Sequence, residues 1–210
     1  MREDSAWKFE TRNSKLEIRK SKLENRDSKL PETNFEFRFS NFEFRVSAGV
    51  SMRIRKLCKE DLAAIIGIQN KTPQASLWTQ ADYANLAGDP LGLILVAELD
   101  TVTPPKIVGF VAFHRVMDEA ELRNMAVDPA HQRQGAGREL LAEGRRRLLE
   151  QGAKQIYLEV RASNLPAQRL YYSAGFGLWA RRRDYYNNPR EDGLVLSLKL
   201  SPPVEVSAIE

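Results

Sequence analysis

Within residues 52–200, hydrophobic residues recur with two different spacings, which predict alternating helices and strands. In 60–70, the leucine and isoleucine residues repeat at helical spacing, which predicts a helix with one hydrophobic face. Continuous hydrophobic runs separated by short polar breaks predict three strands joined by antiparallel hairpins, over 91–99, 107–116 and 120–127.

Helix caps and glycines place the remaining elements. Thr79 is a suitable N-cap for a helix through Leu86, and a longer helix is expected from Gly137 to about Gln151, before Gly152. Shorter patterns predict strands over 53–57 and 155–160, a helix over 165–174, and strands near 176–186 and 194–200. The predicted order, β-α-α-β-β-β-α-β-α-β-β, describes an α/β fold with a mixed sheet.

Residues 1–51 are a different kind of sequence. Ser-Lys-Leu occurs three times at a seven-residue spacing, and Asn-Phe-Glu-Phe-Arg follows twice at the same spacing. One hydrophobic position per repeat makes no coiled-coil seam, and the later Phe/Glu alternation has no partner strand. We therefore interpret 1–51 as a low-complexity extension, either disordered or a mis-assigned start upstream of Met52. Residues 52–200 are the expected domain, and 201–210 are a tail.

Composition excludes several classes of protein. One cysteine, Cys58, and two histidines rule out a disulfide framework and leave no basis for a metal site rich in either residue. No stretch approaches the ~20 hydrophobic residues of a membrane span, and the N-terminal residues lack the hydrophobic run of a secretory signal. A formal net charge of +4 suits an anionic ligand without requiring a nucleic acid. We expect a soluble, cytoplasmic protein.

The candidate chemistry centres on a glycine-containing loop between the strand that ends at Val127 and the helix that opens near Gly137. The backbone N–H groups of such a loop, with a helix N-terminus behind them, form an anion site. Gly135 and Gly137 lack a Cβ atom and let a phosphate approach the backbone. Arg133 and Arg138 could add charge-assisted hydrogen bonds.

Other interpretations of this loop must be weighed. A P-loop would end in Gly-Lys-Ser/Thr, and the Gly-Arg-Glu found here excludes it. A dinucleotide-binding fingerprint gains support from Glu159, about twenty residues further on. However, Leu140 replaces its third glycine, and a long stretch with Pro129 replaces its tight turn. The loop sequence alone is equally consistent with an ordinary glycine-rich turn, in which the chain itself hydrogen-bonds the N–H groups of the helix N-terminus.

The loop sequence Gln132-Arg133-Gln134-Gly135-Ala136-Gly137 resembles the acetyl-CoA motif of the GCN5-related N-acetyltransferase (GNAT) superfamily, Gln/Arg-x-x-Gly-x-Gly/Ala. More narrowly, the chain resembles the RimI-type ribosomal-protein-alanine N-acetyltransferases in the stretches 118–129, 158–164, 170–176, 182–186 and 190–192. The resemblance covers about residues 52–200. It implies the acyl-CoA N-acyltransferase fold, a mixed, mostly antiparallel sheet with flanking helices.

The resemblance also implies a cosubstrate, acetyl-CoA, and the residues that hold it. A strand would pair its backbone with the pantetheine arm through Met125, Ala126 and Val127. The following loop would surround the pyrophosphate through Arg133, Gln134, Gly135, Ala136, Gly137 and Arg138. Asn164 would contact the cofactor, and a helix N-cap is the alternative role for its side chain; both can hold at once. No metal is expected.

Glu159 and Tyr171 match the general base and general acid proposed for this family. The attacking amine must be neutral, and an α-amino group with a pKa of about 7.7–8 loses its proton more readily than a lysine near 10.4. A carboxylate could take that proton, directly or through water, and a phenol could protonate the leaving thiolate. Alternatively, Glu159 forms a structural ion pair with Arg161 or another base, and Tyr171 packs beside Leu170 and Phe176.

Aromatic residues are expected around the substrate groove. Trp78 and Tyr83 resemble the family's short helical segment beside the peptide site, and Tyr185 and Tyr186 either line the groove or pack under the last hairpin. The three arginines of 181–183 are most simply a solvated face.

These expectations combine into one function, the transfer of acetyl from acetyl-CoA to the N-terminal α-amine of a protein. The family's target is the N-terminal alanine of the eighteenth small-subunit ribosomal protein. Direct transfer in a ternary complex is expected, since Cys58 is not placed as an acyl carrier. The alternatives are a GNAT enzyme acting on other protein N-termini or a small amine, and a non-catalytic acyl-CoA-binding module. Neither a nucleic acid nor a membrane is an expected partner.

Overall fold

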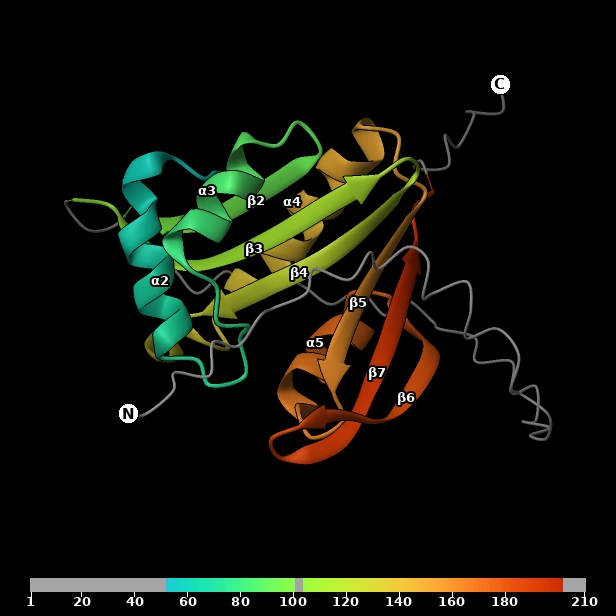
Figure 1. Ribbon diagram of the computed structural model, residues 1–210. Helices are drawn as coiled ribbons and strands as arrows, with labels where there is room; N and C mark the ends of the chain where they lie inside the picture. The colour runs from blue at the N-terminus through green and yellow to red at the C-terminus, as the bar shows by residue number, and fades with distance from the viewer. Residues whose placement is uncertain (1–51, 101–103, 202–210) are drawn as a thin grey trace, which may run out of the picture. The chain divides into compact units, whose positions relative to one another are not determined.

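The computed structural model describes residues 52–100 and 104–201, so the predictions for 1–51 and for all but the first residue of the tail lie outside it. Within these residues, seven strands form one sheet in the order β1-β2-β3-β4-β5-β7-β6 (Figure 1). The pair β4 and β5 is parallel, and every other neighbouring pair is antiparallel. The strands are β1 (Met52–Lys56), β2 (Gly92–Leu99), β3 (Lys106–Val116), β4 (Glu119–Val127), β5 (Gln155–Arg161), β6 (Gly177–Asn187) and β7 (Arg190–Lys199). The mixed, mostly antiparallel sheet confirms the predicted fold class.

Four α-helices within the described residues cover the two faces of this sheet, α2 (Leu62–Asn70), α3 (Gln80–Gly88), α4 (Ala136–Glu150) and α5 (Leu165–Ser173). One hydrophobic cluster joins α2 and α3 to one face of β2, β3 and β4. A larger cluster joins α4 and α5 to the opposite face and extends across β5 and β7. Figure 1 shows α4 behind the first strands and α2 and α3 in front of them. None of the helices that the structure describes therefore covers the face of β5, β6 and β7 opposite α5.

The helix starts follow local chemistry. Thr79 is the N-cap of α3 as predicted, since its Oγ1 accepts from the Asp82 N–H at 3.2 Å and the Asp82 carboxylate accepts from the Thr79 N–H at 2.7 Å. The predicted helix over 60–70 instead begins with a 3-10 turn over Lys59–Asp61, and α2 starts at Leu62. Asp61 explains the difference, because its carboxylate accepts from the Cys58 N–H at 2.8 Å and is held by Arg55 at 2.6 Å.

Strand β7 begins at Arg190, four residues before the predicted start at Leu194. Its first residues are polar and pair with the end of β6, so they carry no hydrophobic signal. The register of β3 and β4 also contains a bulge that the pattern did not predict. Ala112 pairs with Asn124 and Phe113 pairs with Leu122, which leaves Arg123 as the extra residue of β4.

The bulge changes which side chains of β4 face each side of the sheet. Before it, Ala120 and Leu122 point toward α4 and α5; after it, Ala126 points toward α2 and α3. Because side chains alternate along a strand, Glu121 and Asn124 lie on the same face despite their odd spacing. The bulge thus brings charged and polar residues of β4 together on the face without a covering helix at β5.

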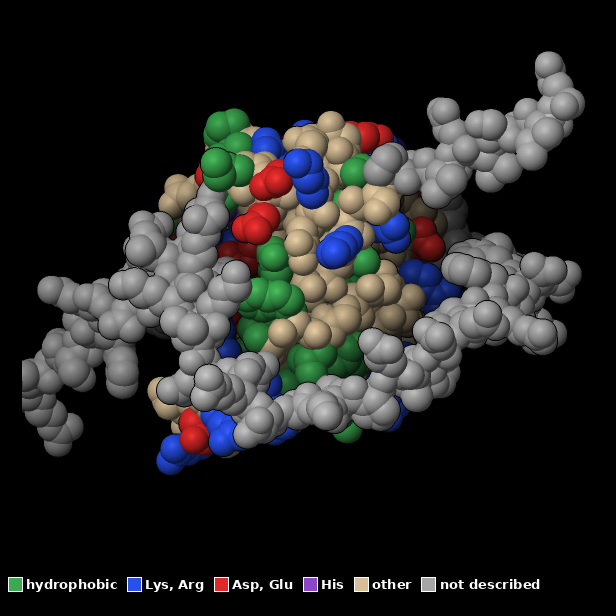
Figure 2. Space-filling model, turned by 90° about the vertical axis from the view of Figure 1, so that its right-hand side faces the viewer, with side chains coloured by type: hydrophobic (Ala, Val, Ile, Leu, Met, Phe, Trp, Pro, Cys, Tyr) green, Lys and Arg blue, Asp and Glu red, His purple; other side chains and the backbone are tan. Residues whose placement is uncertain are grey.

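Charged side chains of both signs are scattered on the face shown in Figure 2, and hydrophobic side chains gather in its lower centre. Among the described residues, no helix is both long and hydrophobic enough to cross a membrane.

Candidate active site

The loop between β4 and α4 has the geometry of an anion site. Gly135 is the N-cap of α4 with φ of +96°, a left-handed conformation that glycine adopts without a Cβ penalty. The backbone N–H groups of Gly135, Ala136 and Gly137 have no acceptor among the described residues. Unpaired N–H groups at a helix start, together with the helix dipole, attract an anion.

The start of the loop is fixed by Asp128, whose carboxylate accepts from the Ala130 N–H at 3.0 Å and contacts the Lys71 ammonium at 3.3 Å. A short 3-10 turn over Pro129–His131 follows. Arg133, with φ of +64°, then leads into the exposed stretch that ends at Gly135. These contacts hold the loop in one conformation above the N-terminus of α4.

Gly137 lets α4 approach its neighbours closely. A Cβ atom at this position would lie 3.0 Å from Leu170 Cδ2 and 3.4 Å from Met125 Cε. The side chain of Ala136 is buried in the hydrophobic core, so Ala136 presents only its backbone to the loop. The predicted pyrophosphate residues are therefore contiguous at the end of β4, with the side chains of Arg133, Gln134 and Arg138 exposed.

The strand before the loop is open on one side. Residues 119–122 of β4 pair with 155–158 of β5, and the register of these two strands goes no further. Among the described strands, only β3 pairs with the backbone of Met125, Ala126 and Val127, and the Val127 carbonyl also accepts from Gln132 Nε2 at 3.2 Å. Figure 1 shows β4 and β5 diverging beyond their short paired region. This is the place where the expected pantetheine arm would add its hydrogen bonds as a strand does.

Glu159 lies on β5 just after the end of that pairing. Its carboxylate Oε1 lies 2.6 Å from Nη1 of Arg182. Burial, and then the negative charge of the nearby Glu159, raises the pKa of Tyr185 to about 12. Glu159 is therefore paired with Arg182, and its role as the general base stays a prediction. Arg161 instead pairs with Glu191 at 2.6 Å.

The expectation of a solvated arginine face over 181–183 is wrong for Arg182. Its side chain is 28% exposed, against 62% for Arg181, which pairs with Asp192 at 2.5 Å. The guanidinium of Arg182 also lies over the ring of Tyr185, with 4.9 Å between the Arg182 Cζ atom and the ring centroid. Residues of β6 alternate across the strand, so adjacent arginines meet different surroundings.

Tyr171 lies on α5 and is buried against Phe176, with the two rings in an edge-to-face arrangement at 5.8 Å. Burial raises the pKa of Tyr171 well above its ordinary value, with a smaller contribution from Tyr186. Tyr171 therefore packs in the core and its phenol stays protonated at neutral pH, and its role as the general acid stays a prediction. Asn164 is the N-cap of α5, its Oδ1 accepting from the Ala167 N–H at 3.2 Å. The structure leaves its cofactor contact a prediction.

Sequence reasoning missed a buried polar network beneath Trp78. Asn124 donates to the Tyr83 hydroxyl at 2.8 Å and to the Ser76 carbonyl at 2.9 Å, and the Tyr83 hydroxyl donates to Gln69 at 2.6 Å. Tyr83 is fully buried, so it supports the segment rather than lining a groove. The partner of Trp78 at the surface is Arg123, whose Cζ atom lies 5.8 Å from the Trp78 ring centroid. No local pattern marks this network, because its members are separated by up to 55 residues.

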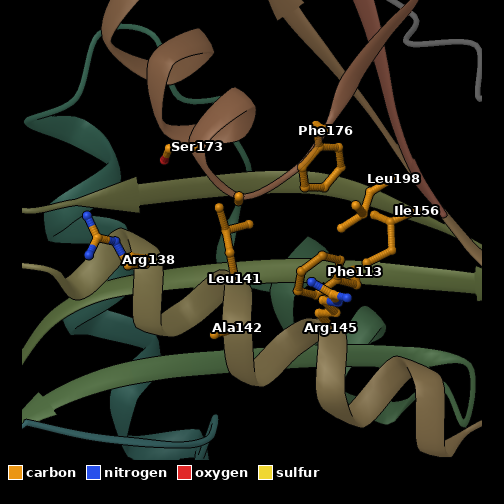
Figure 3. Close-up of a pocket in the computed structure, with 10 residues that line it drawn as sticks. Phe113, Arg138, Leu141, Ala142, Arg145, Ile156, Ser173, Phe176 and Leu198 are labelled. Atoms are coloured by element: carbon orange, nitrogen blue, oxygen red, sulfur yellow. The ribbon is translucent and has the colours of Figure 1, made fainter. Parts of the chain in front are cut away.

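A pocket of about 210 Å³ lies on the other side of the sheet (Figure 3). Figure 3 shows side chains of α4, including Leu141 and Arg145, below Phe176 and Ile156. Ile156 belongs to the cluster under α4 and α5, whereas Glu159 points away from it. The pocket therefore lies on the face opposite to Glu159, and Arg138 of the predicted pyrophosphate loop is one of its lining residues. Across 52–100 and 104–201, His, Cys, Asp and Glu side chains form no group of three that could hold a metal ion.

Known proteins share this sequence and fold. The model of the acetyltransferase (GNAT) family matches residues 59–176. The chain is 36% identical over 150 residues to ribosomal protein bS18 alanine N-acetyltransferase of Escherichia coli (strain K12), which covers 70% of this chain and 97% of that relative. The crystal structure of the Escherichia coli ribosomal-protein-S18-alanine N-acetyltransferase superposes with a TM-score of 0.62 at 34% identity, covering 76% of this chain and all of that one.

A more distant structure, yncA of Salmonella typhimurium, is described with its cofactor acetyl-CoA. It has a TM-score of 0.59 at 23% identity and covers 75% of this chain and 99% of that one, which shows a common fold. The matches confirm the resemblance found in the loop and in the strand and helix motifs. The chain belongs to the acetyltransferase (GNAT) family.

Proposed function

We propose that this protein transfers an acetyl group from acetyl-CoA to the N-terminal α-amine of a protein, namely the N-terminal alanine of ribosomal protein bS18. The observation that carries the proposal is the position of Glu159 at the point where β5 parts from β4, the strand that leads into the anion loop. The 36% identity to an enzyme named for this reaction supports the choice of substrate. A ribosomal substrate fits the expected cytoplasmic location.

Acetyl-CoA supplies the acetyl group as a thioester. The backbone of Met125, Ala126 and Val127 would align the pantetheine arm, because these residues lack a β5 partner. The unpaired N–H groups at the start of α4 would receive the pyrophosphate. The exposed side chains of Arg133 and Arg138 could add charge-assisted hydrogen bonds to its oxygen atoms.

Glu159 would accept the proton that the α-ammonium group loses before it attacks, directly or through a water molecule. The ion pair with Arg182 orients this carboxylate, and a base that is held in a productive orientation reacts more readily. Tyr171, protonated at neutral pH, would donate a proton to the leaving thiolate. The residues thus divide into groups that hold the cosubstrate and groups that move protons.

The test is CoA release by the full chain with acetyl-CoA and short peptides that differ in their first residue. The proposal predicts turnover restricted to peptides that begin with alanine, and its loss in Glu159→Gln. Glu119→Gln is the matched control, since Glu119 is an exposed carboxylate at the far end of the neighbouring strand. Turnover on many peptides or on small amines would retire the ribosomal target. Tight acetyl-CoA binding without turnover would indicate a binding module.

A further inference from the structure

Glu121 is a second carboxylate on the face that carries Glu159. It lies on β4 next to Leu122, the last β4 residue that pairs with β5. Its strand neighbours Ala120 and Leu122 point into the cluster under α4 and α5, so Glu121 points to the opposite side. Leu158 and Val160 point into the same cluster, which places Glu159 on the face of Glu121.

The Glu121 carboxylate is half-buried and has no hydrogen-bond donor or ion-pair partner among the described residues. His114 lies opposite it in β3 but is engaged with Asp89, with 3.1 Å between Nε2 and Oδ2. Arg182 contacts Glu159, and Arg123 lies over Trp78. None of these three cations forms an ion pair with Glu121 in the part of the chain that the structure describes.

Burial raises the pKa of Glu121, and the negative charge of Glu159 adds to this effect, whereas Arg123, His114 and Arg182 oppose it. An acceptor that is withdrawn from water without a donor costs free energy, which a ligand N–H can recover. Glu159, by contrast, already has Arg182 as its ion-pair partner. Glu121 is thus the carboxylate of this face with free acceptor positions.

We propose that Glu121 is a substrate-binding residue whose carboxylate accepts hydrogen bonds from the protonated α-amine of the substrate. This inference rests on the proposed function, because it places the substrate amine between β4 and β5. Glu121 selects the cationic amine, and Glu159 then receives its proton. Glu121 has free acceptor positions for the amine, whereas Glu159 is paired with the guanidinium of Arg182.

The test compares an alanine-starting peptide with the same peptide lacking its α-amino group, for the full chain with CoA bound. Calorimetry gives both binding constants for the unsubstituted protein, Glu121→Gln and Glu119→Gln. We expect the unsubstituted protein and Glu119→Gln to prefer the free-amine peptide by about tenfold or more, as for a hydrogen bond to a charged group. Glu121→Gln should bind both peptides equally. In turnover, it should raise the KM for peptide and leave the KM for acetyl-CoA unchanged.

An equal loss of affinity for both peptides in Glu121→Gln would show a structural role and overturn the inference. So would an unchanged preference for the free amine in that variant, or no preference in the unsubstituted protein. Absence of turnover with every peptide would contradict the proposed function alone, because the binding comparison does not need the reaction.

Discussion

Arg182 reaches across β7 from β6 to place its guanidinium 2.6 Å from the carboxylate of Glu159 on β5. In β7, Gly193 lies beside Arg182 in the register and leaves room above the sheet, where the Tyr185 ring packs. The proposed base is therefore held by Arg182 of the edge strand, and the guanidinium of Arg182 lies in turn over the ring of Tyr185. This relationship gives the edge hairpin a part in positioning the base.

Replacement of Arg182 tests that part directly. Arg182→Gln removes the charge and the shared contact with Tyr185, so the carboxylate of Glu159 samples misaligned positions. We expect kcat to fall about tenfold or more, a size typical of a misplaced catalytic group, with the KM for acetyl-CoA unchanged. Arg182→Lys should recover part of the loss. Arg181→Gln is the matched control, and an equal loss of kcat in that variant would contradict the assignment.

Gly193→Ala tests the packing of Tyr185. The new Cβ atom would lie 2.9 Å from Cδ1 of Tyr185, so the ring must move away from the sheet. We expect a loss of about 1–3 kcal/mol in the free energy of unfolding, as for other overpacked sites, together with reduced kcat. Denaturant titration measures the first effect. Gly177→Ala is the control, because a Cβ atom there meets nothing within 4 Å.

Gly135→Ala tests the anion loop. The φ of +96° disfavours any residue with a Cβ atom, although the space beside Gly135 is open. We expect the KM for acetyl-CoA to rise severalfold while the peptide KM stays constant, and a stability cost of about 1–2 kcal/mol from the left-handed conformation. Gly67→Ala, within α2, should change neither KM. A KM for acetyl-CoA that is unaffected by Gly135→Ala would argue against this loop as the pyrophosphate site.

Asn124→Ala removes the centre of the buried network under Trp78. Its loss leaves the Tyr83 hydroxyl without one donor and the Ser76 carbonyl without another. We expect destabilisation of about 1–3 kcal/mol, the cost of unsatisfied buried polar groups. Thermal unfolding would show it as a lower Tm. Asn85→Ala, an exposed position on α3, should have little effect, and equal Tm values for the two variants would contradict the network's role.

The environment of Glu98 predicts how the free energy of unfolding decreases at acid pH. Hydrogen bonds from Arg55, then Arg53, hold the pKa of this carboxyl to about 2 in the folded protein. Because the pKa of Glu98 is lower in the folded protein than in the unfolded chain, Glu98 contributes its full stabilisation at pH values above the unfolded pKa. This stabilisation is lost as the pH falls toward about 2. Unfolding of Glu98→Gln should show a shallower loss of stability over this range than the unsubstituted protein. A parallel loss in both would mean that other groups cause it.

The sequence predicted the order of elements because each carries a local signal. Thr79 has a side chain that suits an N-cap, and the hydrophobic runs of β2 and β3 are typical of buried strands. The early start of β7 escaped prediction, because its polar residues are paired by the sheet rather than by hydrophobic burial. Boundaries that depend on pairing cannot be read from a single segment.

The candidate site was predictable to the extent that it lies in one loop. Residues 132–138 are contiguous, so their motif was visible in the sequence. The partner of Glu159 was not, since Arg182 is 23 positions away and reaches it over an intervening strand. Glu121 also carried no signal, because its orientation depends on the sheet faces that pairing with β5 defines. Both relationships depend on how strands that are distant in the sequence pair with one another.

The most direct test of the account is to incubate the full chain with acetyl-CoA and intact ribosomal protein bS18 that begins with alanine, and to locate the acetyl group by tandem mass spectrometry. The account predicts a single acetyl group on the α-amine of that alanine, absent when Glu159→Gln is used. Acetylation of lysine side chains, or an unmodified N-terminus beside a catalytically active control enzyme, would contradict it.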